Sequence, residues 1–129
     1  MIQNLTKKIA LMKPQIQFVS GIEESVVPRR IRLTKSENGE TGTATFIFVN
    51  PTVFSLFANL SDSLLIQGMD LMWDNKKINT SDVSVFFKEG KPIMIRSILI
   101  FKNSKEWFNF LNFMNCYSKE TGLSFAEGI

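Results

Sequence analysis

The sequence predicts an α+β fold, in which a single antiparallel, twisted β-sheet built from hairpins has a C-terminal α-helix packed on one face. Three observations predict it. Residues 26–51 contain a turn sequence between two alternating apolar–polar segments, similar short segments recur up to residue 101, and residues 104–121 change to a helical period. The connections between the expected strands are too short for the crossovers that parallel strands need, so the sheet is expected to be antiparallel.

The composition describes a small globular protein that lacks residues on which many enzymes depend. The chain has 129 residues, and residues 15–129 are expected to form one domain, which at this size buries about two-thirds of the surface of its unfolded chain. With one cysteine and no histidine, it can form neither an intramolecular disulfide nor a Cys/His zinc site, and a histidine general base is excluded. The net charge of +3 is too small to mark a dedicated nucleic-acid binder, and it suits an anionic membrane surface or an acidic protein about as well.

Residues 1–14 are expected to be an N-terminal extension. Leu5, Ile9 and Met12 are spaced for one side of a short amphipathic helix, and the alternative is a frayed tail. The apolar part is too short and too interrupted by lysines for a secretory signal, and it is too poor in arginine and serine for a transit peptide. No apolar run in the sequence is long enough to span a bilayer.

The hairpin of residues 26–51 is the best-defined element. Asn38-Gly39 is a preferred pair for a two-residue type I′ turn, in which both central residues need a positive φ. Pairing outward from this turn gives two sets of opposed residues. One face carries the pairs Leu33–Ala44, Ile31–Phe46 and Arg29–Phe48. The other face carries the pairs Thr34–Thr43, Arg32–Thr45 and Arg30–Ile47. One face is mostly apolar and the other is basic and rich in threonine, so a slip of one residue would exchange them.

The segments on either side of this hairpin are less regular. Residues 16–22 alternate as a first strand, with Ile16, Phe18 and Ile22 on one side. The second strand is expected to begin near Pro28, which has no N–H to donate. After Asn50-Pro51 stops the third strand, residues 52–66 are expected to form one irregular helical turn or an apolar loop.

Three more strands are expected between residues 69 and 101. In residues 69–73 the side chains of Met69, Leu71 and Trp73 point inward, and a polar reversal at residues 74–77 leads to a strand over residues 78–88. The turn at Glu89-Gly90 pairs Phe86 with Ile93 and Val85 with Met94. Residues 93–101 are apolar on both faces, which predicts a central strand covered on both sides; Arg96 interrupts one face, either as a snorkelling side chain at a rim or as a recognition residue.

The C-terminal segment has the signals of a helix. Ser104 is a good N-cap, Glu106 favours the positive end of the helix dipole, and Gly122 is a natural stop. The helix is expected to bury one stripe of Trp107, Phe110, Leu111, Met114 and Tyr117 against the sheet. Phe108 lies off this stripe and is expected to be exposed, whereas residues 123–125 are expected to pack back after the cap.

No arrangement of residues in the sequence predicts catalysis. There is no nucleophile elbow, glycine-rich phosphate loop or zinc-protease motif. Asp70 and Asp74 share one side of a strand beside a polar turn and are interpreted as solubilising rather than cation-binding. Cys116 has only Lys119 nearby in sequence to lower its pKa, so a reactive thiol is not expected. These absences favour a binding module over an enzyme, with neither a catalytic residue nor a metal or cofactor expected.

The candidate binding residues are Arg29, Arg30, Arg32 and Lys35 on the first hairpin. Arg30 and Arg32 point the same way, with Arg29 and Lys35 on the other side or near the ends. The patch is either an ordinary solvated strand face or a docking surface for acidic protein loops or lipid headgroups. A small basic nucleic-acid-binding module is the alternative function, although this face offers no aromatic side chain on which bases could stack.

One long segment also resembles a known family. The positions concerned in the first half of the chain are residues 16–18, 21–22, Pro28, 32–34, 38–39, 41–46 and 50–51. Their sequence resembles the photosystem II assembly proteins of the Psb28 family, also called reaction-centre protein W. The same pattern continues in the second half of the chain, at Gly68-Met69, the reversal at 74–77, Glu89-Gly90-Lys91-Pro92, Glu106-Trp107 and residues 122–125. The resemblance covers residues 16–125, whereas residues 1–14 extend beyond the usual start and residues 52–66 are more hydrophobic than expected from the family.

The resemblance implies a function that fits the missing catalytic groups. It implies a non-catalytic assembly factor that binds transiently to photosystem II intermediates containing the inner-antenna chlorophyll protein, near the reaction-centre proteins and the cytochrome b subunits. The factor would be peripheral to the thylakoid membrane, on the stromal side in a chloroplast or the cytoplasmic side in a cyanobacterium, and would hold no cofactor. Part of the contact would be strand addition at an exposed sheet edge. The start of the chain favours a plastid-encoded protein, a mature form or a cyanobacterial origin.

Overall fold

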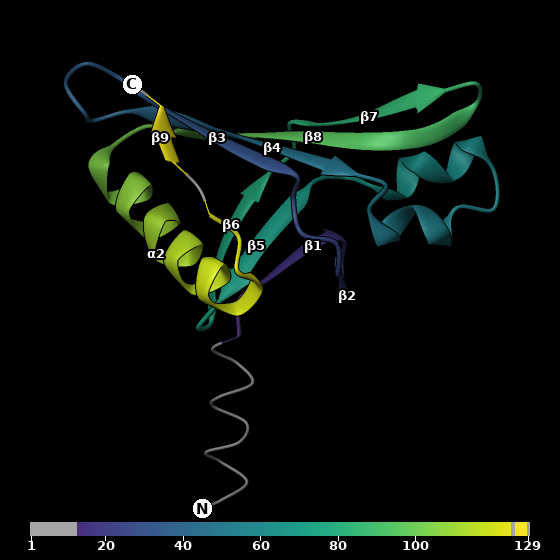
Figure 1. Ribbon diagram of the computed structural model, residues 1–129, viewed down its shortest axis with the longest axis horizontal. Helices are drawn as coiled ribbons and strands as arrows, with labels where there is room; N and C mark the ends of the chain where they lie inside the picture. The colour runs from purple at the N-terminus through teal and green to yellow at the C-terminus, as the bar shows by residue number, and fades with distance from the viewer. Residues whose placement is uncertain (1–12, 125, 129) are drawn as a thin grey trace, which may run out of the picture.

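Two β-sheets and one long helix make up the fold (Figure 1). In the computed structural model, which describes residues 13–124 and 126–128, the larger sheet has the strand order β7-β8-β4-β3-β9 and the smaller one β2-β1-β5-β6. The strands are β1 (Gln15–Val19), β2 (Ile22–Glu23), β3 (Arg30–Lys35), β4 (Gly42–Val49), β5 (Met69–Trp73), β6 (Lys76–Thr80), β7 (Val83–Lys88), β8 (Lys91–Phe101) and β9 (Ala126–Gly128). The helix is α2 (Ser104–Thr121), and two 3-10 helices, η1 (Thr52–Leu56) and η2 (Leu60–Leu65), lie between β4 and β5.

The α+β class is confirmed, but the chain divides its strands between two sheets instead of the single sheet expected. The division falls inside residues 78–88, which were expected to form one strand. There β6 ends at Thr80 and pairs with β5, whereas β7 begins at Val83 and pairs with β8. The Thr80 hydroxyl holds this bend, since it accepts the N–H of Asp82 at 3.0 Å and donates to the carbonyl of Ile98 at 2.7 Å. The strand pairs are antiparallel, as predicted, apart from the parallel pair of β3 and β9.

The register of the first hairpin is confirmed, but its turn type is wrong. β3 and β4 pair Ile31 with Phe46 and Arg30 with Ile47, as the alternation predicts. Among Asn38 and Gly39 only the glycine has a positive φ, so the turn is not type I′. The loop instead closes with the Ser36 N–H on the Thr41 carbonyl at 3.0 Å and the Gly39 N–H on the Ser36 carbonyl at 2.9 Å. A four-residue loop and a two-residue loop with the same centre give the same register, so the faces were predicted correctly.

Paired residues with positive φ occur in two other hairpins. Asp74 and Asn75 join β5 to β6 with φ of 44° and 60°, and Glu89 and Gly90 join β7 to β8 with φ of 52° and 79°. A bulge follows the second turn, because Phe87 pairs with Pro92 whereas Phe86 pairs with Met94. The predicted pairs of Phe86 with Ile93 and Val85 with Met94 are therefore wrong by one residue. A single extra residue on one strand shifts all later pairs, and side-chain alternation alone does not reveal it.

The first predicted strand also contains a break. β1 ends at Val19, and Ser20 and Gly21 turn the chain so that Ile22 starts β2 antiparallel to it. Gly21 has a φ of 84°, which a strand does not use. Ile16 and Phe18 are buried as predicted, but Ile22 is exposed. The second strand starts at Arg30, two residues after Pro28, and residues 52–66 form η1 and η2, in agreement with the predicted irregular helical structure.

The helix covers one face of the larger sheet, as predicted, and its N-cap is one residue earlier than expected. The side chain of Asn103 accepts the Glu106 N–H at 3.0 Å, so Asn103 is the cap and Ser104 the first helical residue. Gly122 ends α2 in the left-handed conformation. The buried stripe includes Phe113, which was not predicted, in addition to Trp107, Phe110, Met114 and Tyr117. Leu111 is only partly buried, whereas Phe108 is exposed and Leu123 packs against the core, as expected.

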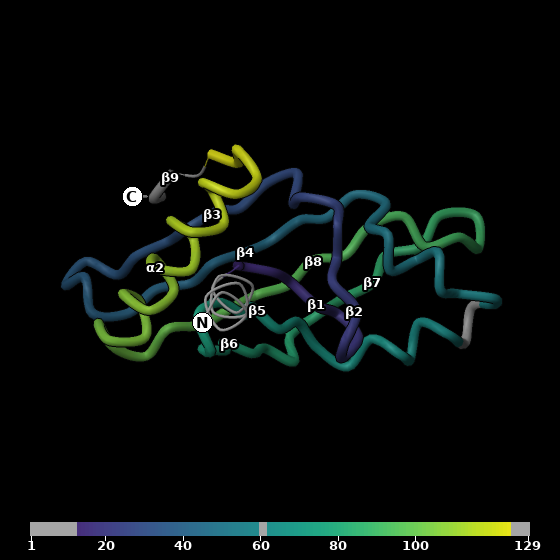
Figure 2. The backbone as a smooth tube through the Cα atoms, turned by 90° about the horizontal axis from the view of Figure 1, so that it is seen from below, coloured from purple at the N-terminus to yellow at the C-terminus, as the bar shows by residue number. Residues whose placement is uncertain are grey.

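The core lies between the larger sheet on one side and both α2 and the smaller sheet on the other (Figures 1 and 2). Ring contacts join the three parts. Phe18 of β1 meets Phe48 of β4 edge to face at 4.9 Å between ring centroids, and Phe46 meets Phe110 of α2 at 6.1 Å. Trp73 of β5 meets Phe113 of α2 at 5.4 Å. The prediction for residues 1–14, a short helix or a frayed tail, falls outside the described residues except at residues 13 and 14.

Candidate interaction surface

The larger sheet has one face that no other described element covers. Its inner face holds buried side chains, including Leu33, Phe46 and Leu99, under α2 and the smaller sheet. In Figure 1 both of those elements lie below the sheet, and the side above it is open. We call this side the outer face; by register it bears the side chains of Arg30, Arg32, Thr34, Thr43, Thr45, Ile47, Val49, Ser84, Phe86, Met94, Arg96, Ile98 and Ile100.

The open outer face corrects the prediction that residues 93–101 form a strand covered on both sides. β8 is central in its hydrogen bonding, because it lies between β7 and β4. Its apolar outer side chains are nevertheless solvent-accessible, and Ile100 is 65% exposed. Ile93, which this prediction also places under cover, is exposed at the bulge. An apolar sheet face of this kind is a candidate interaction surface.

Three arginines stand on the outer face. Arg30 and Arg32 are exposed and point the same way, as predicted, because they alternate with the buried Ile31 and Leu33. Arg96 joins them, since Arg30 pairs with Ile47 and Ile47 pairs with Arg96 across three adjacent strands. Its guanidinium lies 5.1 Å from the ring centroid of Phe86. Sequence reasoning left the role of Arg96 open; pairing the third predicted strand with residues 93–101 would have placed it beside Ile47.

Lys35 does not belong to the outer face. Lys35 lies at the end of β3 with its Nζ 5.8 Å from the ring centroid of Trp107, which belongs to the inner side. Arg29 precedes β3, is exposed, and donates its N–H to the carbonyl of Ile47 at 2.8 Å. The four predicted cations therefore separate into Arg30 and Arg32 on the outer face, Lys35 beside α2, and Arg29 at the start of the strand.

Within the part of the chain that the structure describes, the arginines of the outer face have no acidic ion-pair partner. Among the described residues, the ion pairs join Lys13 to Glu23 and Lys77 to Asp70, both away from this face. None of the outward positions of β3, β4, β7 and β8 on this face is acidic. On these four strands the face thus combines cations with β-branched and apolar side chains and carries no acidic side chain.

β7 is an edge strand with mostly apolar side chains. It pairs only with β8 among the described strands. The Ile98 N–H donates to the Asp82 carbonyl at 2.9 Å, so in this ladder residues 82, 84 and 86 bond toward β8. Val85 therefore directs its backbone N–H and carbonyl away from the sheet, toward solvent. Its sequence, VSVFFK, has a single charge and no proline, so the edge lacks most of the features that prevent strand addition.

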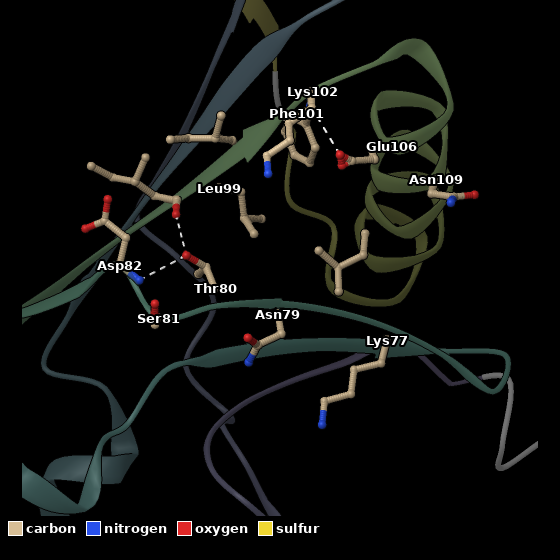
Figure 3. A pocket seen from close by; sticks show the side chains of 13 residues that line it. Lys77, Asn79, Thr80, Ser81, Asp82, Leu99, Phe101, Lys102, Glu106 and Asn109 are labelled. Atoms are coloured by element: carbon tan, nitrogen blue, oxygen red, sulfur yellow. Dashed lines mark hydrogen bonds between the residues drawn. The ribbon is translucent and has the colours of Figure 1, made fainter.

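A groove of about 620 Å³ lies between β6, the end of β8 and the start of α2 (Figure 3). Its polar side chains have structural roles: Thr80 holds the bend described above, and the Glu106 carboxylate accepts the N–H of Lys102 at 3.3 Å. The hydrogen bonds of these side chains run to backbone groups, and none joins a hydroxyl to a carboxylate in this described groove. The described residues also include no group of three or more Cys, Asp or Glu side chains that would hold a metal ion.

The other titratable residues of interest also act structurally. Glu24 is buried, and its carboxylate accepts the N–H of Val53 at 2.9 Å and the N–H and hydroxyl of Thr52, so it fixes the start of η1. Burial raises the pKa of Tyr117 above its ordinary value of 10.0, and the carboxylates of Glu24 and Glu23 raise it further. Cys116 is half-buried on α2 and packs at the edge of the core. Asp70 was interpreted as solubilising; its carboxylate accepts a hydrogen bond from the Asn79 amide and pairs with Lys77, so it links β5 to β6.

No helix in the described part of the chain is long and apolar enough to cross a membrane. The η1–η2 segment does expose leucines, with Leu64 79% accessible to solvent. The backbone of this segment lies at the end of the molecule near the β7–β8 turn (Figure 1). These leucines form a second exposed apolar region, separate from the arginines of the outer face.

Comparison with known proteins gives a consistent result. The family model described as Psb28 protein matches residues 16–125. The chain is 44% identical over 112 residues to a photosystem II reaction center Psb28 protein of Pyropia yezoensis, covering 87% of this chain and 95% of the relative. It is 41% identical over 113 residues to one from Rippkaea orientalis, covering 88% and 95%. A chloroplastic photosystem II reaction center PSB28 protein of Oryza sativa subsp. japonica is 38% identical over 115 residues, which is 89% of this chain and 62% of the relative.

Proposed function

This chain belongs to the Psb28 protein family, and we propose on that basis that it is a non-catalytic assembly factor of photosystem II. The observation that carries the proposal is that relatives from Pyropia yezoensis, Rippkaea orientalis and Oryza sativa subsp. japonica match almost the whole chain and are named photosystem II reaction center Psb28 proteins. The chain binds photosystem II intermediates that contain the inner-antenna chlorophyll protein and leaves before the complex matures. It contacts them from the stromal side in a chloroplast, or the cytoplasmic side in a cyanobacterium, as a protein peripheral to the thylakoid membrane.

Two surfaces support docking of this kind. The first is the basic hairpin, where Arg30 and Arg32 are exposed and the outward positions of β3, β4, β7 and β8 include no acidic residue. Cations in such a position attract acidic loops and raise the association rate, an effect that salt weakens.

The second surface is the edge of β7. The described sheets end in the edge strands β2, β6, β7 and β9. β2 and β9 have only 2 and 3 residues, and β6 carries Lys76 and Lys77, which discourage pairing. β7 offers the longest apolar edge of the larger sheet, and the backbone of Val85 points outward there. An extended tail of the partner adds to this edge as a further strand, with its backbone groups supplying the hydrogen bonds.

The first experiment tests the partner. The full chain is used as bait on detergent-solubilised thylakoids, and we expect it to recover the inner-antenna chlorophyll protein together with the reaction-centre proteins and the cytochrome b subunits. A folded bait that recovers none of these would overturn the proposed function. Binding of RNA at physiological ionic strength, in the absence of photosystem II subunits, would support a nucleic-acid-binding module instead.

The second experiment tests the edge with a proline. Val85→Pro removes an N–H that points to solvent and is not used in the ladder with β8, so it blocks an added strand while leaving the pairing with β8 in place. We expect it to abolish most of the recovery of the photosystem II subunits. Val85→Ala is the matched control, since it trims the same side chain and keeps the N–H. Equal recovery by the proline variant, shown to be folded by its thermal unfolding, would exclude this edge.

A further inference from the structure

We propose that the outer face takes an amphipathic α-helix with acidic flanks, contributed by a partner protein. This inference rests on the proposed function for the identity of the partner, but it concerns a different chemistry from strand addition at β7. It is carried by the positions of three arginines relative to the apolar side chains between them, as fixed by the strand register.

The width of the site fits a helix. Arg30 and Arg96 lie on either side of Ile47, two strands apart in one cross-strand row. With a spacing of about 4.8 Å between neighbouring strands, their Cα atoms are about 10 Å apart. A helix with its side chains is about 10–12 Å across, so a helix that runs along β4 has one arginine beside each flank.

The length of the site fits the same occupant. Arg30 and Arg32 are two residues apart on β3 and point the same way, which separates them by about 7 Å. Residues at positions i and i+4 of a helix are about 6 Å apart along its axis. Two acidic residues with this spacing on one flank therefore meet Arg32 and Arg30, while an acidic residue on the other flank meets Arg96. Arginine suits this role because its planar guanidinium can bind a carboxylate through two hydrogen bonds.

The floor of the site is apolar. Ile47 and Ile98 lie between or beside the arginines and are only partly buried within the chain, so a second apolar layer would remove more of their surface from water. Thr45 separates Arg32 from Ile98 in the next cross-strand row. The apolar stripe of an amphipathic helix fits this strip, with its charged flanks falling over the cations.

The same geometry disfavours other occupants. A second copy of this face would bring arginines against arginines, which costs free energy. A lipid surface is bound best by apolar side chains that project, such as Leu64 in η2, whereas Ile47 and Ile98, the isoleucines beside the arginines, are partly buried within the sheet face. A single nucleic-acid strand would need aromatic side chains for stacking, and the face offers only Phe86, which is already beneath Arg96.

The experiment measures binding of a designed peptide to the full chain by fluorescence anisotropy. The peptide is an amphipathic helix of about 18 residues with a leucine stripe, glutamates at i and i+4 on one flank and a glutamate on the other. We expect Arg96→Glu and Arg30→Glu each to weaken binding at least about tenfold. Lys105→Glu is the matched control, because it makes the same change in charge at an exposed position on α2, outside the outer face, and is expected to leave binding unchanged. A peptide with lysines in place of the glutamates is expected not to bind.

The outcomes separate this inference from the proposed function. If thylakoid pull-down recovers photosystem II subunits equally well with wild type and Arg96→Glu, and the peptide binds both equally, the outer-face inference is wrong and the proposed function stands. If no photosystem II subunit is recovered but the peptide binds and Arg96→Glu weakens it, the site is real and the proposed partner is wrong. Binding of anionic vesicles or RNA that depends on Arg96, without binding of the acidic peptide, would overturn the helix as occupant.

Discussion

The two faces of the larger sheet are built by the same strands and differ in almost every physical respect. The inner face presents side chains such as Phe46 and Leu99, which are buried under α2 and the smaller sheet. The outer face, one residue further along each strand, presents arginines, threonines and partly exposed isoleucines. Because side chains alternate between the two faces of a strand, the inward residues stabilise the fold and the outward residues remain available for binding. Substitutions at neighbouring positions of one strand can therefore separate the two roles.

The largest contrast is expected between two neighbours on β4. Phe46 is fully buried, with its ring 6.1 Å from that of Phe110, whereas Ile47 points to the outer face. Phe46→Ala removes a large buried side chain and leaves a cavity, so it should lower the free energy of unfolding by about 3–5 kcal/mol. Ile47→Ala should cost about 1 kcal/mol or less. Chemical denaturation of both variants checks this, and equal costs would mean that the outer face is packed like a core.

The next contrast concerns the close approach of α2 to the inner face. A Cβ on Gly42 would lie 2.8 Å from the Thr34 carbonyl oxygen and 2.9 Å from Cζ3 of Trp107. Because the first of these atoms belongs to the backbone, Gly42→Ala requires the strand or the helix to shift, and we expect it to cost about 1–3 kcal/mol. Thr43→Ala, on the outer face, is the matched control and should change the free energy of unfolding by less than about 0.5 kcal/mol. A thermal unfolding series compares the two, and an unchanged Gly42→Ala would refute the tight contact with Trp107.

The sequence predicted the faces better than it predicted what covers them. The alternation around the first hairpin assigned Ile31 to the core and Arg30 to solvent correctly, because a buried face and an exposed face need opposite residue types. It could not show that Ile98 and Ile100 are uncovered, since apolar residues on both sides of a strand are also typical of a strand between two layers. The division into two sheets depends on a bend at Ser81-Asp82 that a local hydroxyl stabilises, and no periodicity marks it.

The same limit applies to the candidate site. Arg30 and Arg32 were found from one hairpin, whose turn and alternation are local in sequence. Arg96 lies about sixty residues away and joins them only through the pairing of β4 with β8. Lys35, although it lies close to the arginines in sequence, approaches Trp107 on the inner side, because it occupies an inward position at the end of its strand. Long-range register, and not the number of nearby charges, determines which cations share a surface.

A smaller effect is expected at the cap of the helix that covers the inner face. Asn103 accepts the Glu106 N–H, so Asn103→Ala should cost about 1 kcal/mol. The sequence predicted Ser104 as the cap, and Ser104→Ala is the matched comparison, which should be close to neutral because alanine is favourable inside a helix. Unfolding in urea distinguishes the two positions. A larger cost at Ser104 would restore the predicted cap and contradict the hydrogen bond of Asn103.

Tyr117→Phe, a substitution on the inner side, is expected to change the free energy of unfolding least at neutral pH. Burial and the nearby Glu24 and Glu23 carboxylates raise the pKa of Tyr117 in the folded chain above its unfolded value of 10.0. The folded state therefore retains a proton that the unfolded state loses, and the stability of the wild-type chain should fall as the pH rises above about 10. Tyr117→Phe should flatten this alkaline decrease and change little at pH 7. Thermal unfolding across the alkaline range tests it, and parallel pH profiles of wild type and variant would show that Tyr117 does not couple folding to deprotonation.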